Sequence, residues 1–337
     1  MLFSALPGSE IIMAFPLVMP SFLKEFVDVS KPAEESSSFA DIIVSPAAVE
    51  YVLHPRNPEV LRKLMSIEDS IAYSMIQLSD EHAAQFTEKR EAILKARPEA
   101  EYYWQIRTLM MCVLQNKEVI FEKRILLLNY ALKTIQGMID NHQPQQIPQF
   151  VAVFTQNKEY SKVLEYFKGI SPNPGFSLSD GISLLKSITK VSPAYKEVLS
   201  VIYKNLGVSG PETLNMVDMK KYIELRRIFT EEFMAEHSHW IENLMVNYVW
   251  AYSLPYACGD KLNIWENYVF FCALYNAVKV LVTCYMPGKG EDDFVKAVSS
   301  FDEALGKTGN DLVWKMVAAI RDVGQANNGD MAILTIS

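Results

Sequence analysis

Hydrophobic residues recur along most of the chain at the spacing that favours amphipathic helices. The pattern begins at Asn57-Pro58-Glu59, where a capping residue, a proline and an acid mark the start of a helix. Proline and glycine clusters then divide the chain into segments. The predicted helices cover 81–96, 102–115, 119–142, 149–168, 178–189, 193–205, 212–236, 237–256, 263–286 and 309–325, and a further helix opens at Glu291.

No segment shows the alternating pattern of a half-buried strand. The sequence therefore predicts an all-α protein, a multi-helix globular bundle with an irregular amino-terminal arm. The proline-rich arm covers 1–56, the helical body covers 57–325, and 326–337 form a loose tail. Within the body, a turn cluster separates two sub-halves, 57–170 and 176–325.

Composition and charge narrow the function classes. Half of the residues are hydrophobic, which is ample for a core. The net charge is −8 and no dense Lys/Arg cluster occurs, so we expect no nucleic-acid partner. Gly306-Lys307-Thr308 resembles the end of a phosphate-binding loop, but Phe301 stands where its first glycine would be and no strand precedes it.

The stretch 268–286 is long enough to cross a membrane, but Asn276 and Lys279 lie in its middle. A lysine at that depth would be costly in lipid. The sequence therefore predicts a core helix, with Lys279 directed to an edge or a site, and no membrane partner.

The cysteines and histidines predict neither a metal site nor a disulfide framework. None of the four cysteines, Cys112, Cys258, Cys272 and Cys284, stands in a C-x-x-C pair, and each lies in an apolar helical stretch. Buried free thiols in a reducing compartment are expected, which favours the cytoplasm. His237 and His239 lie two positions apart, so on a helix they point to different faces and cannot share a metal ion.

Residues 240–250 are apolar nearly all round when placed on a helix, which predicts a buried helix. Asn243 and Asn247, one turn apart, are then buried amides that need hydrogen-bond partners. Two interpretations stay open: a clamp between helices, or the floor of a polar pocket. The next predicted helix repeats the theme and favours a polar seam between the two, with Glu266, Asn267, Tyr268, Asn276 and Lys279.

The same region carries the run E-N-x-x-x-N-Y from Glu242 to Tyr248. With further segments in the same order, it resembles the flagellin lysine-N-methylase family over residues 45–325. The other segments are Ser45-Pro46, Trp104-Gln-Ile-Arg107, Leu114-Gln115, Arg124-Ile-Leu, Leu254-Pro255-Tyr256, Glu266-Asn-Tyr268, Tyr275 and Lys279.

The resemblance implies transfer of methyl groups from S-adenosylmethionine to lysine ε-amines of flagellin. The family is also associated with an amino-terminal cysteine-rich region thought to hold an iron–sulfur cluster. Here the first cysteine is Cys112, and Ser45 stands where the family usually has cysteine, so we expect no such cluster in this chain. Near the end, Glu303 and Lys307 stand where the family tends to have Arg and His.

The resulting site hypothesis places catalysis in the polar seam. Glu242 or Tyr248 would take or orient the amine proton, and the substrate or cofactor pocket would be formed by Arg107, Asn243, Asn247 and Tyr268. One alternative is a non-catalytic helical module that binds flagellin or another partner protein. A second is a structural scaffold, which predicts no occupied polar pocket between the helices 237–256 and 263–286.

Overall fold

A computed structural model describes residues 18–21, 56–75, 91, 94–95, 97–157, 160–188, 191–210, 213, 217–252, 254–256 and 262–308. The chain divides into two compact units. Unit 1 comprises 1–54, 66–166 and 243–268, and unit 2 comprises 55–65, 167–242 and 269–337.

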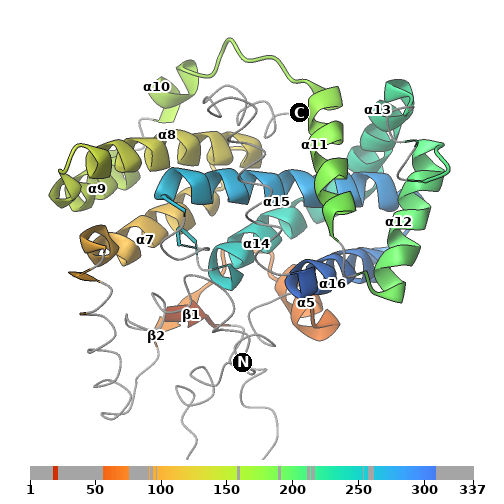
Figure 1. Cartoon of the computed structure of the whole chain (residues 1–337), viewed down its shortest axis with the longest axis horizontal. Helices are drawn as coiled ribbons and strands as arrows, with labels where there is room; N and C mark the ends of the chain where they lie inside the picture. The colour runs from red at the N-terminus through yellow and green to blue at the C-terminus, as the bar shows by residue number, and fades with distance from the viewer. Residues whose placement is uncertain are drawn as a thin grey trace, which may run out of the picture. The chain divides into compact units, whose positions relative to one another are not determined.

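Unit 1 is built around a pair of helices, α7 (Tyr103–Leu114) and α8 (Phe121–Asp140), which pack together and against α9 (Ile147–Asn157) (Figure 1). The turn between α7 and α8 is held by Arg124, whose Nη1 donates to the Leu114 carbonyl at 2.7 Å. This bond caps the end of α7, whose last carbonyls have no partner within the helix.

Shorter elements complete unit 1. They are the 3₁₀ turns η2 (Pro98–Tyr102) and η3 (Pro144–Gln146), and α10 (Tyr160–Glu165). The strands β1 (Val18–Pro20) and β2 (Tyr73–Met75) pair antiparallel, with Met19 opposite Ser74. This two-stranded sheet is an addition to the predicted all-α fold, and three residues are too few for an alternating pattern to show.

Unit 2 begins with α5 (Pro58–Met65), where Asn57 Oδ1 accepts from the Glu59 amide at 2.9 Å. The capping signal in the sequence therefore predicted this helix start correctly. Three further helices also have side-chain caps at their first turns. They are α11 (Pro174–Ser187) capped by Asn173, α12 (Pro193–Leu206) capped by Ser192, and α13 (Met219–Ile228) capped by Asp218.

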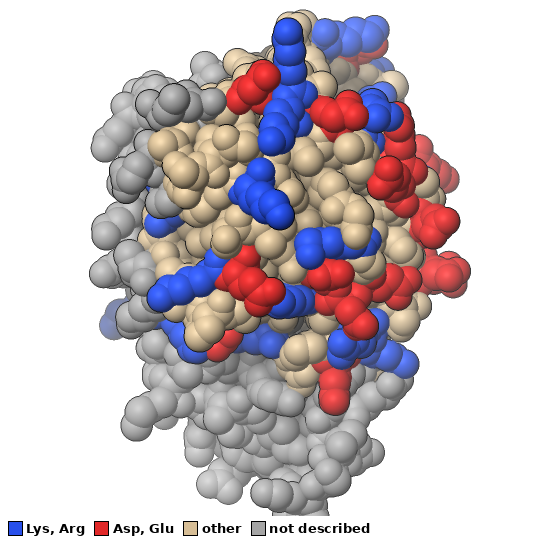
Figure 2. Space-filling view, turned by 90° about the vertical axis from the view of Figure 1, so that its right-hand side faces the viewer, with Lys and Arg blue, Asp and Glu red and all other residues tan. Residues whose placement is uncertain are grey.

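The last described helix, α16 (Glu291–Thr308), packs on α12 and α5 in unit 2. Two exposed ion pairs join these helices: Arg62 Nη2 lies 2.9 Å from Asp292 Oδ1, and Lys296 Nζ lies 2.7 Å from Glu197 Oε1. Charges of both signs lie close together on the face that carries α12 and α13 (Figure 2). The predicted helix at 309–325 lies outside the described residues.

Helix α13 continues through a π-helical turn, η5 (Phe229–Met234), into α14 (Ala235–Ala251). The boundary predicted between 236 and 237 corresponds to a kink, because His237 has non-helical angles (φ −121°, ψ 33°). Helix α15 (Ile264–Tyr285) follows the predicted bounds 263–286 closely. It is long and apolar enough to cross a membrane, but its most apolar window is completely buried within the protein, as in a core helix.

Candidate functional site

A buried arginine joins α7 to α14 in unit 1. The Arg107 side chain, with only 1% of its surface exposed, donates from Nη2 to the Val249 carbonyl at 2.6 Å and from Nη1 to the Tyr103 hydroxyl. Its guanidinium carbon lies 4.0 Å from the centre of the Trp250 ring, at cation–π distance. Since a charge is costly to bury, these contacts are what allow Arg107 to sit inside the unit.

Aromatic rings surround this guanidinium, and we call Arg107, Tyr103, Trp104, Trp250 and Tyr256 the arginine–aromatic cluster. The guanidinium carbon lies 5.3 Å and 5.7 Å from the centres of the Tyr103 and Trp104 rings. The rings also contact one another, with centroids 6.1 Å apart for Trp104 and Trp250 and 5.7 Å apart for Tyr103 and Tyr256. Of this group, only Arg107 was predicted from the sequence as a site residue.

The two tyrosines of the cluster are held in their neutral form. Burial raises the pKa of Tyr103, and the Arg107 charge opposes this only in part. Burial likewise raises the pKa of Tyr256, whose hydroxyl donates to the Glu99 carbonyl at 3.5 Å and whose ring lies under Arg97 at 4.7 Å. Both hydroxyls therefore act as hydrogen-bonding groups at neutral pH and not as proton acceptors.

The two asparagines of the predicted seam are both buried, with 3% of Asn243 and 1% of Asn247 exposed. Asn243 Nδ2 donates to the Ile67 carbonyl at 2.7 Å, so it ties α14 to the segment that leads into β2. That contact is of the kind expected for a clamp between segments.

The predicted tyrosines are fully buried as well. Tyr268, at the start of α15, donates its hydroxyl to the Ile125 carbonyl of α8 at 3.1 Å and stacks on Trp265 at 5.1 Å. The Tyr248 ring lies edge-on to Tyr252 at 5.2 Å. Arg107 thus contacts the carboxy-terminal part of α14, whereas Tyr268 contacts α8.

Glu242 belongs to unit 2, where it is buried with 8% of its surface exposed. Unit 2 also holds a buried polar group that joins α15 to α11. Asn276 Nδ2 donates to the Ser177 carbonyl at 2.9 Å and to Asp180 Oδ2 at 3.0 Å, and the Ser177 hydroxyl donates to Asn276 Oδ1 at 2.6 Å. Burial raises the pKa of Asp180, and the bond from Asn276 opposes that shift.

The sequence predicted the polar character of Asn276 but missed Ser177 and Asp180. On the same helix, Lys279 is also buried, with its amine 5.6 Å from the centre of the Tyr275 ring. Ser177 and Asp180 lie on α11. Residue spacing within one helix does not show which residues of another helix it faces, so these partners could not be predicted.

The thiols differ in exposure. Cys272 and Cys284 are buried in α15, as predicted, but Cys112 is exposed. The prediction failed for Cys112 because it shares the outward stripe of α7 with Thr108, one turn earlier. Burial raises the pKa of the Cys284 thiol, which keeps it neutral.

The described residues offer neither a metal site nor a site for the sulfonium of S-adenosylmethionine in the arginine–aromatic cluster. Within the described ranges, no three His, Cys, Asp or Glu side chains are grouped as a metal ion requires. In the arginine–aromatic cluster, the guanidinium of Arg107 covers the Trp250 ring at 4.0 Å. The ring is therefore occupied by an internal cation, and as arranged here the cluster does not fit the sulfonium of S-adenosylmethionine.

These features define a helical protein with a buried arginine–aromatic cluster and buried amides in its core. Residues 107–333, about two thirds of the chain, match the FliB lysine N-methylase C-terminal domain. The chain belongs to this family. No curated protein and no solved structure matches the chain.

Proposed function

We propose that this chain is a flagellin lysine N-methylase of the cytoplasm, which adds methyl groups from S-adenosylmethionine to lysine ε-amines of flagellin. The observation that carries the proposal is the family match over 107–333, which begins at Arg107 and includes the run from Glu242 to Tyr248. We make this proposal for the helical body, residues 57–325, alone.

The chemistry requires a neutral amine, because a protonated lysine has no electron pair to offer. The proposal assigns acceptance or orientation of the amine proton to Glu242 and Tyr248. Both side chains are buried, and the low exposure of Glu242 would keep a nearby amine away from water. Asn243, Asn247 and Tyr268 would hold polar groups of the substrate or cofactor. Arg107, whose Nη1 and Nη2 already donate within unit 1, would position α14 for them.

Matched variants of α14 test these assignments. Purified protein, flagellin and S-adenosylmethionine are incubated together, and methyl groups on lysine are counted by mass spectrometry. Glu242→Gln is expected to lower the rate at least about 100-fold, the scale of a lost acid–base group. Glu236→Gln, an exposed position on the same helix, serves as the control and should keep the full rate. Equal rates for the two variants would remove Glu242 from the site.

A second candidate is a non-catalytic helical module that binds flagellin or another partner protein. It is favoured by Glu303 and Lys307, which stand where the family tends to have Arg and His. In α16 these two side chains form an ion pair across one helical turn. Saturable binding of flagellin without uptake of S-adenosylmethionine, measured by calorimetry, would support this module and contradict the methylase.

A further inference from the structure

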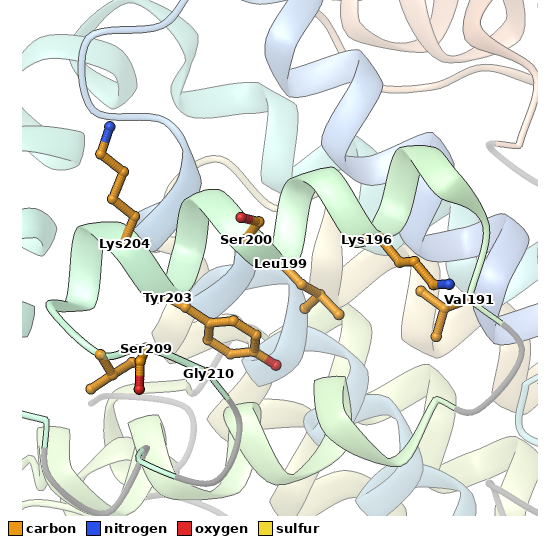
Figure 3. A pocket seen from close by; sticks show the side chains of 9 residues that line it. Val191, Lys196, Leu199, Ser200, Tyr203, Lys204, Ser209 and Gly210 are labelled. Atoms are coloured by element: carbon orange, nitrogen blue, oxygen red, sulfur yellow. The ribbon is translucent and has the colours of Figure 1, made fainter.

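A groove on unit 2 runs along α12 and the turn that follows it (Figure 3). Its volume is about 590 Å³. The turn is formed by Gly207, which ends α12 in the left-handed conformation (φ 75°) and lets the next residues fold back as one wall. The groove is lined by Val191, Lys196, Leu199, Ser200, Tyr203, Lys204, Val208, Ser209 and Gly210.

The floor of the groove is a stripe along one face of α12. Lys196, Leu199 and Tyr203 are three and four positions apart, the spacing that places side chains on one helix face. Figure 3 shows Leu199 and Tyr203 extending from the same side of the helix. Both are partly exposed, so an apolar and aromatic surface is open to a ligand.

The groove is basic although the chain as a whole carries a net charge of −8. Lys196 and Lys204 are exposed near its two ends, and neither forms an ion pair with another described residue. The nearest acid along α12, Glu197, is already paired with Lys296 at 2.7 Å. Two exposed positive charges therefore lie at positions eight residues apart, about 12 Å along a helix.

The openness of the groove favours a peptide over a small molecule. Small-molecule sites enclose most of the ligand surface, whereas peptide grooves are open and use apolar anchors with charges beside them. From the basic ends and the apolar floor we infer that this groove binds an acidic segment of a partner protein, in which a large apolar residue lies between two acids. An extended peptide spans 12 Å in about four residues, which sets the spacing of the acids.

This inference concerns partner binding by α12 and holds whether or not the chain transfers methyl groups. The test uses the full chain and a fluorescein-labelled peptide with an acid at each end of a short Leu- and Phe-containing centre. Fluorescence anisotropy should show saturable binding that weakens as salt is added, because exposed charge pairs are screened. A second peptide carries Lys in place of each acid and should not bind.

Variants of the chain locate the binding. The double variant Lys196→Glu with Lys204→Glu should weaken peptide binding about tenfold or more, from the loss of two exposed charge contacts and their replacement by repulsion. Leu199→Ser should weaken peptide binding because it removes an apolar side chain from the floor of the groove. Both variants should keep the helical circular dichroism spectrum of the parent. Lys220→Glu, an exposed charge reversal on α13, is the matched control and should bind as the parent does.

Three results would overturn the inference. They are absence of binding by the acidic peptide, equal binding of the acidic and lysine-containing peptides, and equal loss in the Lys220 control and the double variant. Because no methyl donor is present in this assay, failure here leaves the methylase proposal to its own test.

Discussion

Replacing Arg107 with methionine should destabilise the protein strongly, because the arginine is buried and its contacts are specific. Methionine fills a similar length but cannot donate to the Val249 carbonyl or to the Tyr103 hydroxyl. Each hydrogen bond from a charged donor contributes about 1.5–3 kcal/mol, and a desolvated cation–π contact about 2 kcal/mol. Removing a buried charge recovers part of this sum, so we expect a net loss of about 2–5 kcal/mol.

Urea denaturation followed by circular dichroism measures this free energy of unfolding. Arg107→Lys keeps the charge but offers a different donor geometry, so it should fall between the parent and Arg107→Met. Arg62→Met provides the matched control, because the Arg62–Asp292 ion pair is exposed and should contribute no more than about 1 kcal/mol. A loss below about 1 kcal/mol for Arg107→Met would refute the inference that the contacts of buried Arg107 stabilise unit 1.

Three further predictions concern unit 2 and the thiols. Gly181→Ala should cost about 1–3 kcal/mol in chemical denaturation, because a Cβ there would lie 2.6 Å from Val280 Cγ2, whereas Gly137→Ala has open space and should cost nothing. Because burial raises the pKa of Asp180 above its ordinary value of 3.8, the folded state should lose stability as the pH rises from that value through the folded-state pKa. The Asp180→Asn variant should not lose stability in this way. If the free energy of unfolding changed with pH in the same way for the parent and the variant, the prediction would be contradicted. In the native protein, a thiol reagent should modify Cys112 before the buried thiols of α15, although desolvation raises the pKa of Cys112 and slows its reaction. Peptide mapping that finds Cys112, Cys272 and Cys284 labelled equally would contradict this order.

The strongest helical signals in the sequence predicted the fold well. Hydrophobic spacing located α15 almost to the residue, and Asn57 marked the start of α5 through a bond that depends only on neighbouring residues. The kink at His237 was visible only as a boundary between two helices. Local periodicity was sufficient in these cases because the determinants lie within one or two helical turns.

The contacts of the candidate site could not be predicted in the same way. Arg107 was selected, but its partners Val249 and Trp250 lie more than 140 positions away on α14. The aromatic residues of the cluster look like ordinary core residues in the sequence, since their role depends on the side chain that they face. The same holds for Asp180 and Asn276, which are joined only when α11 packs on α15.

The most direct test of the central claim is a methylation assay with the unmodified chain, flagellin and trideuteriomethyl-labelled S-adenosylmethionine. We expect labelled methyl groups on lysine side chains of flagellin, located by tandem mass spectrometry, and none when the chain is omitted. Flagellin that binds the chain saturably but gains no label would contradict the methylase and support the binding module.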